Sequence, residues 1–213
     1  MLPLFLQEYN PIWVTVISAI FIVITTFFII AGINTKSISA IIGTTGGVLI
    51  AGALAYTIGS AANLTGLSSE EANMLIFIPQ NIEFNFRGLL FAGIIIGALG
   101  AVMDVAMSVA SSMHEIREIN PEIDSYNLMK SGMNVGRDIM GTMSNTLILA
   151  YTGSSIPLLL VFIAYEASMV KILNMDLIAT EIVRSLVGSI GLILTIPITS
   201  FTTGFIVNLK KRP

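Results

Sequence analysis

Asp104 is the residue best suited to do chemistry, because it is an acidic residue inside a stretch that is otherwise apolar or small, residues 91–113. A helix of roughly 20 such residues spans the hydrocarbon core of a bilayer. A carboxylate in that core costs about 2.5–3.5 kcal/mol on insertion scales, so proteins keep one where it faces a bundle interior or a wet cavity. Asp104 is therefore a candidate for binding a coupling proton or ion. The alternative is a buried polar group that fixes the register of packed helices.

The neighbours of Asp104 at helical spacing are small. Gly93, Gly97 and Gly100 precede it and Ser108 follows it. Residues three and four apart share one face of a helix, and small residues let a second helix approach closely. We expect this face to form a seam with another helix and not to face lipid.

A second small-residue ridge lies earlier in the chain. Gly43, Gly47, Ala51, Ala55 and Gly59 follow one another at every fourth position. This spacing predicts close packing against another helix. The alternative is a surface along which a moving helix slides.

Hydroxyl and charged residues mark further candidates near the end of the chain. Thr195 and Thr199 share one face of a spanning stretch. They could line a proton or ion path near Asp104, or they could bond their own backbone, as threonine often does in membrane helices. Glu181 and Arg184 are three residues apart, which predicts a routine pair on a solvated surface.

The segment Gly153-Ser154-Ser155-Ile156-Pro157 interrupts an apolar run. Proline inside a helix removes a backbone hydrogen bond and kinks the helix, and the freed carbonyls need partners or water. We expect a break here. It is either a packing kink or a broken helix beside a polar cavity, as transporters use.

The composition excludes an ordinary soluble domain. Of 213 residues, 54% are hydrophobic and 11% are charged, whereas soluble domains carry about 25% charged residues. Apolar runs of spanning length fall at residues 12–32, 38–60, 88–112, 142–165 and 184–207. The prediction is an all-α membrane protein with about five transmembrane helices, forming a single polytopic domain over residues 1–213 in a lipid bilayer.

One polar segment separates the third and fourth spans. Asn120-Pro121-Glu122 has the character of a helix start, and Ser131-Gly132 that of a helix end. We expect a short amphipathic helix on the cytoplasmic membrane surface.

Basic residues indicate the orientation of the chain. With five spans, one side holds seven of the ten basic residues and the other side three. The positive-inside rule then places the N-terminus outside and the C-terminus in the cytoplasm. Arg137 and Asp138 would stand at the cytoplasmic mouth of the fourth span, where Arg137 could reach towards Asp104 or simply form an interfacial charge pair with Asp138. The larger set of basic residues is Lys36, Arg117, Lys130, Arg137, Lys210, Lys211 and Arg212, and the smaller set is Arg87, Lys171 and Arg184.

Enzyme signatures are missing from the sequence. It contains no P-loop, HExxH, GxSxG or dinucleotide-binding motif. It has no cysteine and one histidine, which argues against a thiolate site or a histidine-ligated zinc site. We expect no enzymatic activity, no cofactor, no metal and no nucleic-acid partner.

The strings RGLLFAGIIIGALGAVMDVAMSVASSMHEI, SGMNVGRDIMGTMSNTLILAYTGSSIPLLL and EIVRSLVGSIGLILTIPIT closely resemble the YibE/F family of bacterial multipass membrane proteins. The resemblance runs from about residue 32 to residue 207. The chain is similar to the short, YibF-like form, which implies a bacterial cell membrane location and a longer YibE-like partner.

A weaker resemblance links the chain to SecD/SecF and the wider RND superfamily of proton-driven machines. There, intramembrane acidic residues couple proton flow to movement of an extracytoplasmic domain, and two helical repeats are paired. The resemblance implies that Asp104 and Arg137 are the corresponding charged positions. It also implies that a second copy or the YibE-like partner supplies the other repeat.

These observations lead to two readings of the function. The first is a membrane subunit of an ion- or proton-coupled transport, export or energy-transducing assembly, acting as a homo-oligomer or with a YibE-like protein. The alternative is a non-transporting membrane scaffold that assembles a larger YibE-like partner.

Overall fold

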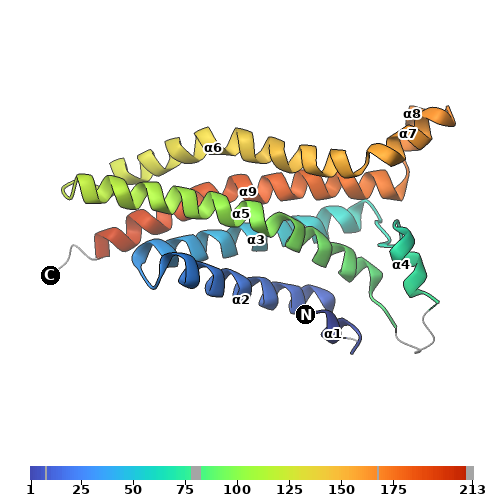
Figure 1. Cartoon of the computed structure of the whole chain (residues 1–213), viewed down its shortest axis with the longest axis horizontal. Helices are drawn as coiled ribbons and strands as arrows, with labels where there is room; N and C mark the ends of the chain where they lie inside the picture. Colours follow the sequence, from blue (N-terminus) through green and yellow to red (C-terminus); the bar gives the residue numbers. More distant parts are fainter. Residues whose placement is uncertain (8, 78–82, 167, 210–213) are drawn as a thin grey trace.

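The computed structural model describes residues 1–7, 9–77, 83–166 and 168–209, and all regular structure among these residues is helical (Figure 1). This agrees with the predicted all-α membrane bundle. The helices are α1 (Leu2–Phe5), α2 (Pro11–Ala31), α3 (Thr35–Ala61), α4 (Glu70–Leu75), α5 (Phe86–Ile119), α6 (Ser125–Ser154), α7 (Ile156–Ala164), α8 (Met169–Leu173) and α9 (Asp176–Leu209).

Asparagine side chains begin the first three long helices. Asn10 Oδ1 accepts a hydrogen bond from the Ile12 amide at 3.0 Å, with Pro11 in the first helical turn. Asn34 and Asn85 accept in the same way at the starts of α3 and α5, each at 2.8 Å. Such caps satisfy amide donors that have no carbonyl partner in the first turn of a helix.

Within the described residues, four helices are long and apolar enough to cross a membrane: α2, α3, α5 and α9. The bent pair α6 and α7 makes a fifth crossing if it is counted as one span, with a bend of 51° at Ser155. Figure 1 shows α1, α4 and α8 at one end of the bundle, which we call the α4 end. The α2–α3 and α5–α6 turns lie at the opposite end, which we call the turn end.

The predicted amphipathic surface helix is not a separate element. Instead, α5 continues to Ile119, and after a short turn α6 runs from Ser125 through the predicted helix end at Ser131-Gly132. At 1.5 Å per residue the 34 residues of α5 are about 51 Å long, against about 30 Å for the hydrocarbon core. The polar segment therefore forms the ends of two spanning helices.

Gly132 explains why the prediction of a helix end was wrong. A Cβ atom at Gly132 would lie 2.3 Å from Met113 Sδ and 2.8 Å from Ser200 Oγ. The glycine lets α6 pack closely on α5 and α9 and does not mark a turn. The predicted helix start at Asn120-Pro121-Glu122 was also wrong, because Asn120 caps the end of α5, Pro121 lies in the turn, and α6 begins at Ser125.

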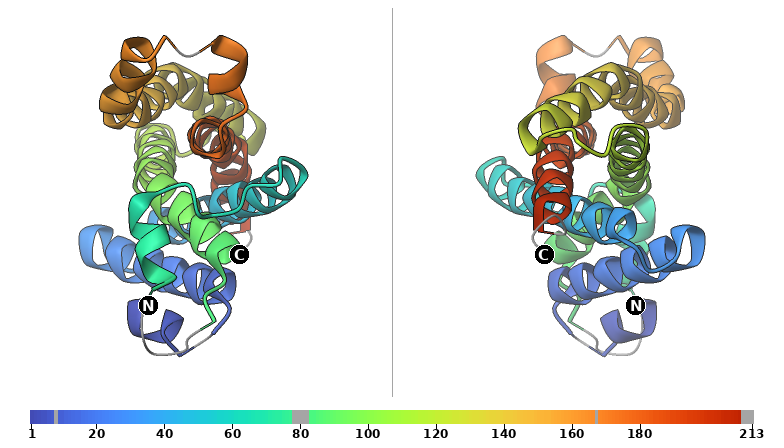
Figure 2. Two further views of the ribbon diagram at one scale, coloured as in Figure 1. Left: turned by 90° about the vertical axis from the view of Figure 1, so that its right-hand side faces the viewer. Right: turned by 90° about the vertical axis from the view of Figure 1, so that its left-hand side faces the viewer.

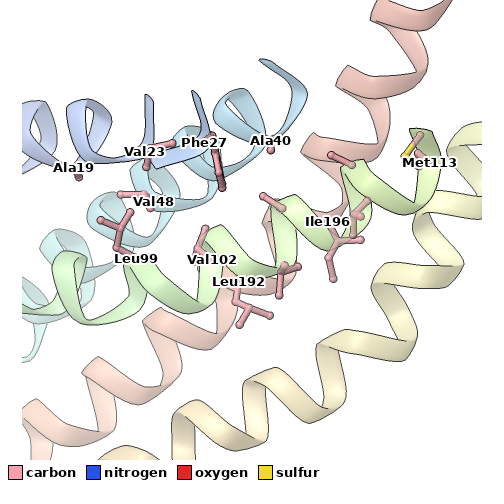
Figure 3. Packing of buried hydrophobic residues seen from close by; sticks show 14 of the residues in the cluster. Ala19, Val23, Phe27, Ala40, Val48, Leu99, Val102, Met113, Leu192 and Ile196 are labelled. Carbon is pink, nitrogen blue, oxygen red and sulfur yellow. The ribbon is translucent and has the colours of Figure 1, made fainter. Parts of the chain in front are cut away.

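α5 lies at the centre of the bundle and contacts α2, α3, α6 and α9. Figure 3 shows buried residues of these helices meeting in the main core, among them Val23 of α2, Val48 of α3, Val102 of α5 and Leu192 of α9. Lipid tails are as apolar as leucine side chains, so the hydrophobic effect does not drive spanning helices together. Close packing and polar contacts between helices hold such a bundle together instead.

The most extensive helix pairing joins α3 and α9, and it uses the predicted ridge of α3. A Cβ atom at Gly43 or Gly47 would fall on Thr199 Oγ1 or Thr195 Oγ1, at 1.9 and 1.8 Å. Ala51 meets Gly191 of α9 in the same seam. The glycines thus leave the space that the threonine side chains of α9 fill.

Candidate functional site

Asp104 lies in the middle of α5, and its side chain is exposed on the surface of the chain. Gly93, Gly97 and Gly100 are also exposed on the same face, and a Cβ atom at Gly93 or Gly100 would meet nothing within 4 Å. We call these four residues the open stripe. In Figure 1 α5 lies between α6 above and α2 below, and Figure 2 shows the same helices end-on.

The open stripe is the face that was predicted to form a seam with another helix, and within the described chain most of it is left exposed. Its residues were expected to pack against another helix. Among its three glycines, Gly97 alone has a described residue, Tyr151 of α6, near its Cβ position, while buried residues of α5 such as Ile95 and Val102 lie on the other faces of the helix. The small residues instead leave this face of α5 exposed. The face that carries Asp104 is therefore available to something outside this chain.

No residue that the structure describes forms an ion pair with Asp104. An unpaired carboxylate at this depth of a spanning helix is costly in hydrocarbon. The cost falls when the group takes up a proton, binds a cation or meets a donor from another molecule.

The register of α6 on α5 follows from two contacts. Gly132 lies against Met113 near the turn end, and the Tyr151 hydroxyl lies 3.0 Å from the Cβ position of Gly97 towards the α4 end. Tyr151, Ser144 and Arg137 follow one another at intervals of seven residues, which keeps them on nearly the same face of α6. Tyr151 lies against Gly97 of the open stripe, and Ser144 and Arg137 follow it along the same face of α6.

This register places Ser144 about level with Asp104, and Arg137 about one and a half helical turns nearer the turn end. Arg137 and Asp138 are both exposed. Among the described residues neither forms a salt bridge, so the predicted approach of Arg137 to Asp104 is not made within one chain. The Ser144 hydroxyl is buried, and no described residue forms a hydrogen bond with it.

The structure does not bring Thr195 and Thr199 to the open stripe. Both are completely buried in the α3–α9 seam, where Thr195 Oγ1 donates to the Gly191 carbonyl at 2.9 Å. In the described part of the chain, Thr199 Oγ1 is buried without a hydrogen-bond partner, as are the hydroxyls of Thr44 and Ser39 of α3. The two α3 hydroxyls were not predicted from the sequence, although they lie beside the glycine ridge and helical spacing could have identified them.

The predicted break is present between α6 and α7. Ser154 Oγ and Ser155 Oγ donate to the Tyr151 carbonyl at 2.7 and 3.1 Å, and Pro157 lies in the first turn of α7. The serines thus satisfy a carbonyl at the end of α6. Gly153, Ser154 and Pro157 are exposed, so the break faces the outside of the chain and not an internal polar cavity.

Glu181 and Arg184 form more than a solvated pair. Arg184 Nη1 donates to Glu181 Oε1 at 2.8 Å, and their side chains are only 29% and 20% exposed. The guanidinium lies 5.9 Å from the centre of the Tyr151 ring. Arg184 Nε, Glu181 Oε2 and the Tyr151 hydroxyl are buried, and none of them has a hydrogen-bond partner among the residues that the structure describes. The sequence showed the α9 pair, but the contribution of Tyr151 depends on how α6 packs.

Comparison with known proteins gives one match. The family model for YibE/F-like proteins matches residues 1–209. No curated protein and no solved structure matches the chain. The weaker resemblance to SecD/SecF therefore stays a prediction.

Proposed function

Because the chain belongs to the family of YibE/F-like proteins, and because it carries an unpaired carboxylate on an open face of a spanning helix, we propose that it is a membrane subunit of an ion- or proton-coupled assembly. Asp104 is the coupling residue. The observation that carries this proposal is the exposed, unpaired position of Asp104 among Gly93, Gly97 and Gly100.

Asp104 alternates between two states in this proposal. When the carboxyl binds a proton or cation, the open stripe is uncharged and can pack against an apolar helix. When the carboxylate is free, it favours a donor or water on the same face. Binding and release thus change which surface lies against the stripe, which is the two-state behaviour that coupling requires.

Arg137 and Asp138 are secondary participants. They lie on the exposed part of α6 towards the turn end, where they can pair with charges of another subunit. Thr195 and Thr199 have no part in the proposal, because they fill the α3–α9 seam. The second subunit is another copy of this chain or a YibE-like protein.

Proteoliposomes test the coupling role. We expect Asp104→Asn to abolish proton- or cation-driven flux that the wild-type assembly supports, and Asp104→Glu to retain part of it. Glu115→Gln is the matched control, since Glu115 is an exposed acidic residue near the end of the same helix. Equal flux in wild type and Asp104→Asn would reject the proposal.

The scaffold alternative makes a different prediction for the same variant. If Asp104 only fixes helix packing between subunits, Asp104→Asn separates the assembly in detergent. Co-purification of the subunits, measured alongside flux, therefore distinguishes a coupling residue from an assembly residue.

A further inference from the structure

The helices α7 and α8 form an apolar projection at the α4 end of the bundle. Among the described residues of α7 only Phe162 is buried, and all of α8 is exposed or half-buried. The large apolar side chains of Ile163, Tyr165, Met169 and Val170 are between 69% and 81% exposed. One chain alone therefore leaves this projection uncovered.

The position of α8 is at the membrane surface and not in the hydrocarbon core. Figure 1 shows α7 and α8 reaching beyond the start of α9, at the same end as α1 and α4. Charged groups are costly in hydrocarbon, and Lys171 lies within α8 while Asp176 follows it at the start of α9. Lipid tails do not cover apolar side chains at that level. Exposed apolar patches in such a place mark sites of protein contact.

A cavity of about 770 Å³ lies at the same end, and α1, α4 and the start of α5 form most of its walls. The walls include apolar side chains such as Leu2 and Leu75. Pockets of about 300–1,000 Å³ hold a small molecule, so this one has room for several apolar side chains. Its charged lining residues are Arg184 and Glu71. Arg184 Nη1 is paired with Glu181 Oε1 at 2.8 Å, whereas Glu71 forms no ion pair with any described residue.

Lys171 gives the projection the charge that the cavity lacks. Its side chain is exposed, and within the described chain it forms no ion pair. The projection is thus apolar with one unpaired positive charge, and the cavity is apolar with one unpaired negative charge at Glu71. Opposite charges placed across an interface select the correct partner and fix its register.

We propose that the cavity binds α7 and α8 of a second copy of this chain, with the partner's Lys171 beside Glu71. Figure 2 shows α7 and α8 at one edge of the bundle and α1 at the opposite edge, so the projection of one chain lies away from its own cavity. Two copies with the same membrane orientation bring the projection and the cavity to the same depth. Because the two surfaces differ, the contact is head-to-tail, and it closes into a ring where the rotation between copies allows.

The same contact would cover part of the open stripe. Gly93 and Gly97 line the cavity as well as belonging to the stripe, so the second copy lies beside the half of the stripe nearest the α4 end. The inference goes beyond the proposed function and does not involve Asp104. Its test measures contact between copies and not flux, so it fails or succeeds separately from ion coupling.

Disulfide cross-linking tests the contact, because the chain has no native cysteine. One copy carries Val170→Cys in α8, and a second copy with a different tag carries Ala72→Cys, which lines the cavity. The two are co-expressed, so that the cell inserts both in one orientation, and the membranes are oxidised. We expect a disulfide that joins the two tags. The matched control replaces Ala72→Cys with Glu118→Cys at the turn end and should give no such product.

A charge exchange tests the pairing of Lys171 with Glu71. Lys171→Glu in the copy with Val170→Cys should lower cross-linking about fivefold, since an exposed ion pair contributes up to about 1 kcal/mol. Glu71→Lys in the copy with Ala72→Cys should then restore it. Lys130→Glu, at an exposed lysine of the turn end, is the control and should change nothing.

Two results would overturn the proposal. The first is the absence of a disulfide between the α8 and α4 sites when both variants migrate in detergent like wild type, which would leave lipid or another protein as the cover of the projection. The second is a disulfide that forms only between two copies of Val170→Cys, which would show a two-fold contact through α8. Cross-linking that does not respond to the charge exchange would reject the pairing of Lys171 with Glu71.

Discussion

Asp104 and Thr195 show why two polar residues in spanning helices have different requirements. The Thr195 hydroxyl meets its need for a hydrogen-bond acceptor within its own helix, by donating to the Gly191 carbonyl. An ionised carboxylate has no proton to donate, so Asp104 cannot use the same solution. It needs a proton, a cation or a donor from elsewhere, and its exposure on the open stripe leaves that position accessible.

We predict that a hydrophobic carbodiimide modifies Asp104 in the purified chain. Such reagents partition into apolar surroundings and add to protonated carboxyl groups, and Asp104 is both exposed and in the middle of a spanning helix. Peptide mass spectrometry should find the adduct in α5 of wild type and not in Asp104→Asn. Glu115, near the helix end, should react with a water-soluble carbodiimide instead. An unmodified Asp104 would show that the open stripe is closed in solution.

The long helices could be predicted from sequence because apolar length is a local property. The spans at 12–32, 38–60 and 184–207 correspond to α2, α3 and α9, and the break at Pro157 was also recognised. The same kind of reasoning was wrong at Gly132, where a glycine that serves helix packing was interpreted as a helix end. Local signals cannot separate these two uses of glycine, because the difference lies in which helix is adjacent.

The site was harder to predict than the spans. Helical spacing correctly grouped Asp104 with Gly93, Gly97 and Gly100 on one face. It could not show whether another helix of the chain covers that face. This depends on the placement of α2 and α6 on either side of α5, which no property of residues 91–113 determines.

At the scale of one helix pair, we predict that Gly47→Ala destabilises the α3–α9 seam. The new Cβ atom would lie 1.8 Å from Thr195 Oγ1 and 2.9 Å from the Gly191 carbonyl oxygen, so α3 or α9 must move. Overpacking of this kind costs about 1–3 kcal/mol. Thermal unfolding in detergent should show the loss.

Gly141→Ala is the control for this prediction, since nothing lies within 4 Å of its Cβ position. Alanine should be neutral there or stabilise α6 by up to about 1 kcal/mol, because glycine is a poor helix former. Similar behaviour of the two variants would show that the seam is looser than the contacts to Thr195 indicate.

The ends of the bundle separate some of the basic residues on which the predicted orientation rests, while Lys210, Lys211 and Arg212 lie outside the described residues. Lys36, Arg117 and Lys130 belong to the turn end, while Arg87 and Lys171 belong to the α4 end. The positive-inside rule then favours a cytoplasmic turn end. The orientation itself is a proposal.

Cysteine labelling tests the orientation, because the chain has no native cysteine. Glu118 and Glu70 are both exposed, at the turn end and the α4 end. In intact cells an impermeant maleimide should label Glu70→Cys and label Glu118→Cys only after the membrane is opened. The reverse pattern would invert the topology and place Arg137 on the outer side.

The open stripe also predicts how subunits meet. A charged group in a spanning helix is almost always covered by protein or water, so we expect the stripe to lie against a second subunit in the native membrane. Gly100→Leu should weaken that assembly without unfolding the chain, since nothing lies within 4 Å of its Cβ position in a single copy. Ala53→Leu, at an exposed small residue of α3, is the control. Chemical cross-linking in membranes, followed by sizing in mild detergent, should show a smaller species for Gly100→Leu only. If both variants assemble like wild type, another face of the bundle forms the subunit contact. Asp104 then contacts water or lipid and not a second subunit.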